Sequence, residues 1–350
     1  MKSLEVYIHV PFCKSRCLYC DFFSTTALDK REQYVQAVIR EAQERVKGNV
    51  STIYFGGGTP SMLSVEQLTQ ILNAIGAQAQ EITLEANPGD LTKEKLRALR
   101  AAGFNRLSIG IQSFRDKELQ LIGRRHSADE ARAAVKMAQA AGFDNISIDL
   151  MYALPGQTTT DWQYNIDEAL KLNVQHISCY CLTYEPHTAL TRLIENGTLS
   201  PADEDTENEM YDLLCNRLKD SGFKHYEVSN FARHRYYSRH NSGYWNNTPY
   251  IGLGAGAHSY DGQKRRWNIS DLDRYIACCA FEEETLTAEQ IEMERIMLGL
   301  RTCTGIEYDD VLLRKAQPFL DKGQLSIKNN RLVATQSGLH ILNRIIEALV

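Results

Sequence analysis

The stretch VYIHVPFCKSRCLYCDFFS, residues 6–24, joins a short apolar run to a loop that carries three cysteines within eight positions. These are Cys13, Cys17 and Cys20, in the spacing C-x3-C-x2-C. Cysteines this close together predict a metal site, because thiolates bind zinc, copper(I) and iron–sulfur clusters. Such sites usually have four protein ligands, so the segment raises the question of what occupies the fourth position.

Around this segment, short apolar runs alternate with amphipathic segments of helical length. The predicted strands are residues 6–10, 52–55, 82–86, 107–111, 146–150 and 176–181. The predicted helices between them are residues 29–46, 65–77, 93–101, 129–141 and 160–172. Strands that alternate with helices form βα units around a parallel sheet. Because six units are fewer than the eight of a closed barrel, the sequence predicts an α/β fold with a partial (β/α)6 barrel.

The pattern changes in the second half of the chain. A helix, a short strand, an aromatic and basic loop and a glycine-rich segment are predicted at residues 203–220, 224–231, 233–245 and 252–258. A further helix, a hairpin around Asn329-Asn330 and a last helix are predicted at residues 288–300, 325–333 and 339–349. We therefore expect a barrel with the cysteine loop, a barrel extension and a small α+β C-terminal domain, at residues 1–190, 191–280 and 281–350.

The composition is that of an ordinary soluble globular protein, with 43% hydrophobic and 24% charged residues in a chain of 350. The net charge of −5 argues against a general nucleic-acid-binding or membrane-binding surface. The first residues lack the apolar region of a secretory signal, and no uninterrupted apolar run is long enough to span a bilayer. We therefore expect a cytoplasmic protein whose nine cysteines bind metal, act in catalysis or are small buried hydrophobic residues, rather than forming disulfides.

Polar or glycine-rich groups follow nearly every predicted strand. In chain order they are His9 with the cysteine loop, Gly56-Gly57-Gly58-Thr59, Glu85-Ala86-Asn87-Pro88, Gln112-Ser113, Asp149 and Tyr184. The ligands of barrels and open α/β sheets bind at the carboxyl ends of the strands. Each group alone is ordinary for the start of a loop, but six in sequence predict one binding site along that edge.

The cysteine spacing alone leaves zinc and an iron–sulfur cluster as alternatives. No second C-x2-C pair occurs, although His9 offers a fourth ligand for zinc. A four-iron cube normally takes four thiolates, so three thiolates leave one iron with an open position. An open position is what a reactive metal centre needs in order to bind a substrate.

With a strand before the first cysteine and Tyr19 just before the third, the motif resembles the signature of the radical S-adenosylmethionine (SAM) superfamily. The resemblance covers residues 6 to about 185. It implies that the three cysteines bind a 4Fe–4S cluster and that the amino and carboxylate groups of SAM bind the open iron. In that superfamily an electron from the cluster cleaves SAM into methionine and a 5′-deoxyadenosyl radical.

Longer phrases resemble the oxygen-independent coproporphyrinogen III oxidase family over essentially the whole chain. They are YIHVPFC at residues 7–13, GGGTPS at 56–61, IDLMYALP at 148–155 and GLGAGAHS at 252–259. This resemblance implies SAM contacts at Tyr7, Tyr19, Gly57, Gly58, Thr59, Glu85, Gln112, Arg124, Asp149 and Thr183.

Two features separate this sequence from the oxidases of that family. The oxidases carry a further cysteine two residues after the third cluster cysteine, where this chain has Phe22, and an N-terminal extension, whereas this chain reaches its first predicted strand by residue 6. The sequence resembles instead the HemW subgroup, regarded as haem chaperones. It shares that subgroup's H-N-x-x-Y-W motif, which is associated with haem, at His240, Asn241, Tyr244 and Trp245. The resemblance implies that His240 ligates haem iron and that Tyr244 and Trp245 flank the macrocycle.

The leading hypothesis is a haem chaperone that binds a 4Fe–4S cluster, SAM and haem, receives electrons from a donor, and delivers haem to acceptor proteins such as membrane cytochromes. Delivery to membrane cytochromes would suit a peripheral position at the inner face of the membrane. The enzyme alternative is radical oxidative decarboxylation of coproporphyrinogen III propionates. A third hypothesis is RNA modification, because RHRYYSRH at residues 233–240 interleaves basic and aromatic residues. The net acidity counts against it, so no nucleic acid partner is expected.

Overall fold

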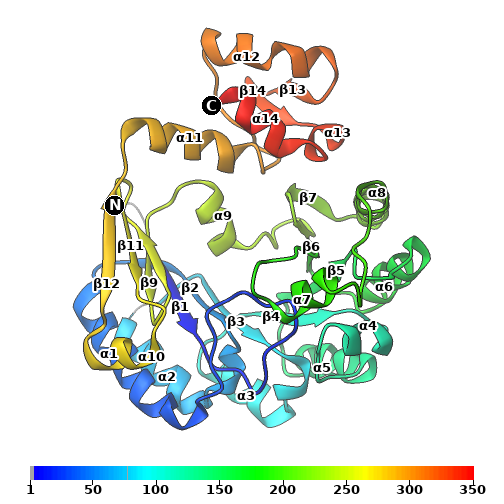
Figure 1. Ribbon diagram of the computed structural model, residues 1–350. Coiled ribbons are helices and arrows are strands. Elements are labelled where there is room, and N and C mark those ends of the chain that lie inside the picture. The colour runs from blue at the N-terminus through cyan, green and yellow to red at the C-terminus, as the bar shows by residue number, and fades with distance from the viewer. Residues whose placement is uncertain (1–3, 77) are drawn as a thin grey trace.

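The computed structural model describes residues 4–76 and 78–350, so the end predicted for the second helix, at residue 77, lies outside the described residues. Twelve strands form one sheet in the order β12-β11-β10-β9-β1-β2-β3-β4-β5-β6-β8-β7. Its centre consists of the six strands that the sequence predicts, all parallel. Their bounds are β1 (Leu4–Val10), β2 (Val50–Gly57), β3 (Glu81–Ala86), β4 (Arg106–Gln112), β5 (Ile146–Tyr152) and β6 (His176–Cys181). The sheet curves without closing into a ring (Figure 1), which confirms the partial barrel.

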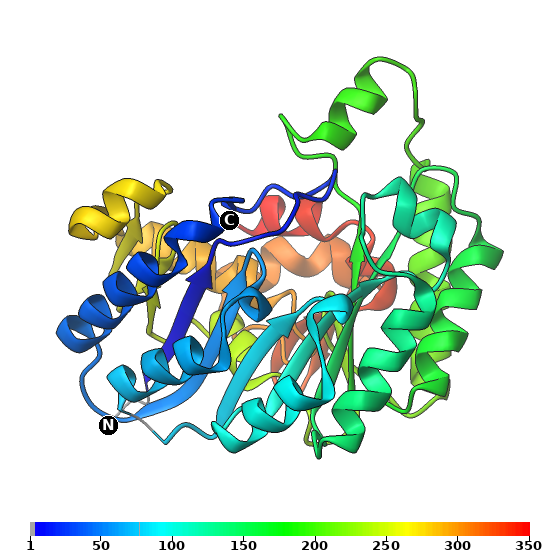
Figure 2. The same ribbon diagram turned by 90° about the horizontal axis from the view of Figure 1, so that it is seen from below.

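The helices that connect these strands cover the outer face of the sheet, as Figure 2 shows from below. They are α1 (Arg31–Arg45), α2 (Val65–Ile75), α3 (Lys93–Ala101), α4 (Asp116–Leu121), α5 (Ala128–Ala140) and α6 (Thr159–Lys171), with the 3-10 helices η1 (Leu28–Lys30), η2 (Pro60–Met62) and η3 (Pro88–Asp90). Capping decides where three of them begin, because the side chains of Ser64, Ser127 and Thr158 each accept a hydrogen bond from the backbone three residues on. Gly76, in the left-handed region at φ 66°, ends α2.

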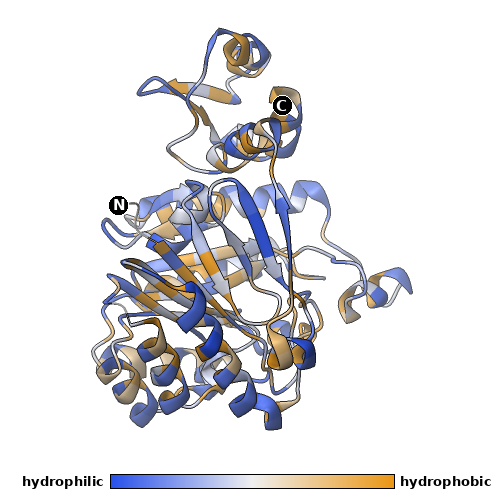
Figure 3. Cartoon of the chain, turned by 90° about the vertical axis from the view of Figure 1, so that its left-hand side faces the viewer, coloured by the Kyte–Doolittle hydropathy of each residue, from blue (hydrophilic) through white to orange (hydrophobic). Residues whose placement is uncertain are grey.

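Further strands extend both edges of this six-stranded centre, and among them the sequence predicted only a strand at residues 224–231. On one side β9 pairs parallel with β1, and β10, β11 and β12 continue the sheet antiparallel. On the other side β8 and β7 pair antiparallel with β6 and with each other. The bounds are β7 (Lys224–Glu227), β8 (Asn230–Ala232), β9 (Tyr250–Leu253), β10 (His258–Tyr260), β11 (Lys264–Asn268) and β12 (Phe281–Thr285). Figure 3 faces the β12 edge, where hydrophilic strands lie and all five residues of β12 are exposed.

Two local predictions in this region are wrong. Residues 224–231 form a hairpin instead of one strand, because the chain turns after Glu227, whose side chain accepts a hydrogen bond from the N–H of Ser229 at 3.2 Å. Residues 233–245 are not all loop, because Ser238 accepts a hydrogen bond from the backbone of Asn241 and so starts α9. The helices of this part are α7 (Ala189–Glu195), α8 (Glu204–Asp220), α9 (Arg239–Trp245) and α10 (Leu272–Cys278).

The C-terminal part has a small hydrophobic core of its own and stands apart from the sheet in Figure 1. Its elements are α11 (Ala288–Gly299), α12 (Asp310–Asp321), β13 (Leu325–Lys328), β14 (Arg331–Ala334), α13 (Gln336–Leu339) and α14 (Leu342–Leu349). The hairpin prediction is confirmed, and Asn329 and Asn330 take the left-handed φ values of 48° and 59° that a type I′ turn requires. The sequence predicts that the small domain starts at residue 281. Residues 281–285 form β12, however, which belongs to the large sheet. The part with its own hydrophobic core therefore begins at α11.

The small domain is attached at the β7–β8 hairpin. The N–H of Val228 donates to the carbonyl of Arg301 at 2.9 Å, and the N–H of Cys303 donates to the carbonyl of Tyr226 at 3.0 Å. The C-terminal domain thus supplies main-chain partners at an edge of the large sheet, where backbone groups would otherwise be unpaired.

A buried carboxylate ties α1 to the strands added beside β1. Glu41, 2% exposed, accepts hydrogen bonds from the N–H of Gly254 at 3.0 Å, from Asn268 Nδ2 at 2.9 Å and from the Tyr275 hydroxyl at 2.6 Å. It also pairs with Arg45 Nη1 at 2.6 Å. Because its oxygens are well supplied with donors, this buried charge holds the added strands and α10 against α1.

Replacing Glu41 by alanine should lower the free energy of unfolding by about 3–5 kcal/mol, because it leaves Arg45 and several buried donors without their acceptor. Urea denaturation measures the change. Glu44→Ala, on the same helix but exposed, is the matched control and should change stability by less than about 0.5 kcal/mol. An equal loss in both variants would contradict the role of Glu41.

Candidate cofactor site

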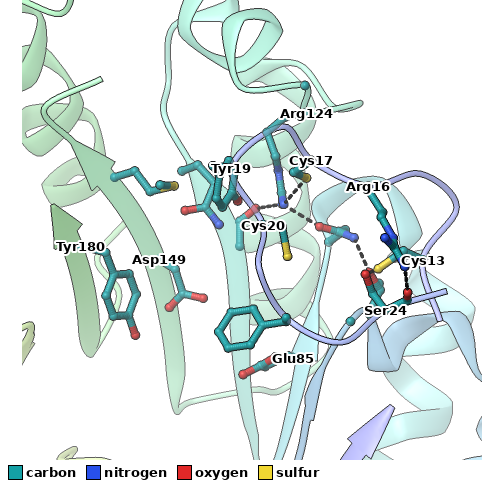
Figure 4. Close-up of a pocket in the computed structure, with 18 of the residues that line it drawn as sticks. Cys13, Arg16, Cys17, Tyr19, Cys20, Ser24, Glu85, Arg124, Asp149 and Tyr180 are labelled. Carbon is teal, nitrogen blue, oxygen red and sulfur yellow. Dashed lines mark hydrogen bonds between the residues drawn. The ribbon is translucent and has the colours of Figure 1, made fainter. Parts of the chain in front are cut away.

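A cavity of about 900 Å³ opens at the carboxyl ends of the parallel strands, where the sequence predicts a site. The cysteine loop forms one wall, and the ends of β5 and β6 form the opposite wall (Figure 4). Main-chain hydrogen bonds hold the loop: Cys13 N–H donates to the Thr25 carbonyl at 2.9 Å, and Leu18 N–H donates to the Ile122 carbonyl at 3.2 Å. These bonds fix the path of the loop along the cavity.

The three cysteines of the loop line this cavity (Figure 4). Cys13 Sγ lies 3.4 Å from Thr59 Oγ1, and Cys17 Sγ accepts a hydrogen bond from Arg124 Nη1 at 3.6 Å. His9, the alternative fourth ligand for zinc, has both ring nitrogens in hydrogen bonds. Among the described residues, no three side chains of His, Cys, Asp or Glu are close enough to hold a single metal ion. Three thiolates without a fourth protein ligand would leave one iron of a 4Fe–4S cluster open to a further ligand.

Burial raises the pKa of the Cys13 and Cys20 thiols. Both therefore keep their protons near neutral pH until a metal displaces them. The guanidinium of Arg124 supplies positive charge beside the sulfur of Cys17, which suits a thiolate there. Cluster assembly on this loop thus releases protons.

The glycine-rich turn after β2 brings bare backbone to the cavity. Gly57 has a φ of +107°, and a Cβ atom there would lie 2.6 Å from the ring of His9. A Cβ atom at Gly58 would lie 2.7 Å from the carbonyl carbon of Pro11. Only glycine fits at either position, so backbone groups of this turn can approach a ligand closely.

Glu85 places a buried carboxylate beside this turn. Its Oε1 accepts a hydrogen bond from the Tyr54 hydroxyl at 2.7 Å, and its Oε2 accepts one from the N–H of Gly57 at 3.2 Å. Burial raises the pKa of Glu85 to about 7. A cationic ligand group at this position would favour the ionised carboxylate, so the site suits an ammonium or a hydroxyl donor.

Nine of the ten residues predicted to contact SAM line the cavity: Tyr19, Gly57, Gly58, Thr59, Glu85, Gln112, Arg124, Asp149 and Thr183. The tenth, Tyr7, is not a lining residue, and its hydroxyl lies 3.1 Å from His9 Nδ1. That these residues bind SAM stays a prediction. Gln112 adopts a φ of 69°, a strained value for a residue with a side chain, which is typical of positions that a functional site constrains.

Asn87, which the sequence places in the polar group after β3, also lines the cavity, and its Oδ1 accepts a hydrogen bond from Arg124 Nη2 at 2.6 Å. Sequence reasoning missed other residues of the cavity wall. Tyr152, Tyr180 and Tyr211 form an aromatic surface on the far side from the cysteines, here called the distal wall. Nothing in the local sequence indicates that the last of these, on α8, reaches the cavity.

The H-N-x-x-Y-W motif lies outside this cavity, on α9. His240 is fully buried, with Nδ1 2.8 Å from Thr52 Oγ1 and Nε2 2.8 Å from the Tyr244 hydroxyl. Burial lowers the pKa of His240 to about 3, so its ring is neutral at physiological pH. Both ring nitrogens of His240 are thus in hydrogen bonds in this arrangement, and its predicted role as a haem ligand stays a prediction. Asn241, Tyr244 and Trp245 are partly buried, and the described cavity lining includes none of the four.

Comparison with known proteins agrees with this architecture. A profile of the radical SAM superfamily matches residues 7–169. The chain is 39% identical to heme chaperone HemW of Bacillus subtilis, over 87% of this chain and 85% of that protein. It is 34% identical to HemW of Mycobacterium tuberculosis H37Rv, over 99% of this chain and 94% of that protein. It is 40% identical to the mitochondrial radical S-adenosyl methionine domain-containing protein 1 of Mus musculus, over 99% of this chain and 87% of that protein. The solved structure of coproporphyrinogen III oxidase (HemN) from Escherichia coli superposes with a TM-score of 0.86 at 23% identity, covering 99% of this chain and 90% of that one, which confirms the fold.

Replacing Cys13, Cys17 or Cys20 by alanine should abolish the cluster, because we expect each thiolate to bind a different iron. The measurement is iron and acid-labile sulfide per chain after anaerobic reconstitution. Cys303→Ala changes an exposed cysteine and should keep the wild-type content. Full iron and sulfide in any one of the three loop variants would remove that cysteine from the ligand set.

Replacing Glu85 by glutamine should stabilise the ligand-free protein at pH 8 and change little at pH 5. The pKa of Glu85 is raised from 4.5 to about 7, so the folded protein holds this proton more tightly than the unfolded chain does. Stability is therefore lost as the pH rises through this range, by about 1–3 kcal/mol at most, and the amide avoids that loss. Urea unfolding of both proteins between pH 5 and pH 8 tests this, and a difference that does not vary with pH would contradict it.

Proposed function

Because the chain belongs to the HemW family of haem chaperones within the radical SAM superfamily, we propose that it binds haem and delivers it to acceptor proteins. The observation that carries this proposal is the similarity to HemW proteins, at 39% and 34% identity over 87% and 99% of the chain. A fold alone does not imply a function. A similarity of this degree over the barrel, its extension and the small domain supports a shared function.

Membership of the radical SAM superfamily implies a 4Fe–4S cluster and SAM. We assign the cluster to the three cysteines of the loop. When bound together with SAM, the cluster supplies the electron for reductive cleavage of SAM. Residues of the chain hold these groups. Arg124 keeps positive charge beside Cys17. Glu85 presents a carboxylate to an amino or hydroxyl group of SAM.

The oxidase alternative is less well supported. At the position where the oxidases carry a further cysteine, Phe22 lines the cavity with 70% of its surface exposed. Its ring provides apolar surface and no thiol. The structural similarity to HemN, at 23% identity, shows the fold alone.

For haem, we infer that the distal wall of the cavity is the binding surface. Tyr180 is 41% exposed there, whereas Tyr152 and Tyr211 are buried and pack against each other, with ring centroids 6.5 Å apart. An exposed aromatic ring suits contact with a planar macrocycle.

We also propose haem-requiring proteins as acceptors, membrane cytochromes among them, and a redox protein as the electron donor of the cluster. A cytoplasmic location, with a peripheral position at the inner face of the membrane, would bring the protein to such acceptors. Within residues 4–76 and 78–350, the structure has no helix with the length and apolar character of a membrane span.

Haem titration of the anaerobic, cluster-loaded protein tests the proposed function. We expect a saturable Soret band and transfer of the bound haem to a haem-free cytochrome. In a parallel incubation with SAM, a reductant and coproporphyrinogen III, we expect no protoporphyrinogen. Formation of protoporphyrinogen would support the oxidase, and absence of haem binding would refute the chaperone.

Haem binding should depend on the distal wall and not on His240. Tyr180→Ala removes aromatic surface and should weaken haem affinity about fivefold or more. His240→Ala should leave the Soret maximum where it is, because we infer from the hydrogen bonds of both ring nitrogens that this buried ring does not bind iron. A shifted Soret maximum in His240→Ala, together with unchanged haem affinity in Tyr180→Ala, would assign haem binding to His240 instead of the distal wall.

A further inference from the structure

The ring of His240 packs against two tyrosines of the parallel sheet. Its centroid lies 5.0 Å from that of Tyr54, at an interplanar angle of 20°, and 6.3 Å from that of Tyr7, at 26°. Both distances are within the range of stacked rings. The histidine of α9 therefore contacts β1 and β2, the two strands that lead into the cysteine loop and the glycine-rich turn.

The contact with Tyr54 leads to the carboxylate of the cofactor site. The Tyr54 hydroxyl donates to Glu85 Oε1 at 2.7 Å, and the other oxygen of Glu85 accepts the N–H of Gly57 at 3.2 Å. The ring and the hydroxyl of Tyr54 are rigidly connected. His240 packs against the ring and Glu85 accepts a hydrogen bond from the hydroxyl, so the position of His240 limits where Glu85 can lie. The glycine-rich turn is held by the same carboxylate.

The contact with Tyr7 leads to the cysteine loop. His9 Nε2 lies 2.8 Å from the carbonyl of Phe23, which follows the third cysteine closely in sequence. A carbonyl only accepts hydrogen bonds, so Nε2 carries the proton and Nδ1 accepts from the Tyr7 hydroxyl, 3.1 Å away. Tyr7 thereby fixes the orientation of the ring that holds the end of the loop.

The helix α9 is anchored firmly enough to support these contacts. The carboxylate of Glu81 accepts hydrogen bonds from the N–H groups of Arg239 and His240, both at 3.1 Å. A Cβ atom at Gly243 would lie 2.0 Å from Glu5 Oε2, so a side chain there would displace the Glu5 carboxyl group from its present place beside the helix. The position of the His240 ring is therefore set by the sheet and not by solvent.

We propose that His240 is a positioning residue for the SAM and cluster site: from α9 it holds Tyr54 and Tyr7, and through them Glu85 and the cysteine loop. This inference rests on the proposed function only in placing SAM at Glu85. Coupling between two sites is reciprocal, so SAM binding favours the docked position of α9. Any event that withdraws His240 from the two tyrosines weakens SAM binding by the same factor.

The affinity of the anaerobically reconstituted protein for SAM, without haem, tests this inference. His240→Ala and Tyr54→Phe should each weaken SAM binding about fivefold to tenfold. Both should also alter the electron paramagnetic resonance spectrum of the reduced cluster with SAM bound. Ser242→Ala is the matched control, since its hydroxyl donates to the Ser238 carbonyl of its own helix at 2.7 Å, and it should bind SAM like the wild type. Wild-type SAM affinity in His240→Ala would overturn the inference.

If His240→Ala does not fold, Thr52→Val tests the positioning role of His240 instead. This variant removes the hydroxyl 2.8 Å from His240 Nδ1 and changes no residue that lines the cavity. It should weaken SAM binding about threefold, because the ring is then less well fixed. Unchanged SAM affinity would overturn the inference.

A double-mutant cycle separates positioning from a general loss of structure. In a Tyr54→Phe background, His240→Ala should weaken SAM binding by a smaller factor than in the wild type, because the path to Glu85 is already cut. If the effects of the two substitutions on SAM affinity are fully additive, His240 does not act through Tyr54. A protein that shows these SAM effects but binds no haem would refute the proposed function and leave this inference standing.

Discussion

The register of the parallel strands is the constraint on which the site depends. Successive residues of a strand face opposite sides of a sheet, so a slip by one residue would turn every inward side chain outward. The observed pairing places Glu85 opposite Ser108 and Asp149 opposite Ser178. The apolar residues of the same strands pack against the covering helices, in one continuous core. Burial of that outer face therefore determines which polar side chains meet inside the barrel.

The polar interior lowers the stability that the fold would otherwise have. Arg106 is 1% exposed, and its Nε and Nη1 atoms have no hydrogen-bond partner. Groups of this kind cost about 1–3 kcal/mol each when buried unsatisfied. The raised pKa of Glu85 has the same origin, since burial disfavours its charge. Departures from a well-satisfied interior are typical of functional sites, and of these two residues Glu85 lines the cofactor cavity.

The H-N-x-x-Y-W motif shows how a local pattern and its tertiary role can differ. A histidine followed by aromatic residues has the chemistry of an exposed metal site, and nothing in the motif itself indicates burial. In the structure, strands β1 and β2 supply Glu5 and Thr52, which surround the histidine ring. By our proposal, the motif becomes part of the support of the cofactor site.

The sequence by itself determined the six βα units, the cysteine loop and the asparagine hairpin, because periodicity, capping and turn chemistry act between residues close in the chain. It also predicted that the strand-end groups with Gly57, Glu85, Gln112 and Asp149 lie at one edge, since the carboxyl ends of parallel strands must meet, and these four residues line the cavity. Only the tertiary structure decided that β9 lies beside β1, that Tyr211 reaches the cavity from α8, and that His240 is buried. These outcomes depend on pairing and packing between segments far apart in the chain, and such contacts are selected by the burial of the whole molecule, which no local pattern encodes.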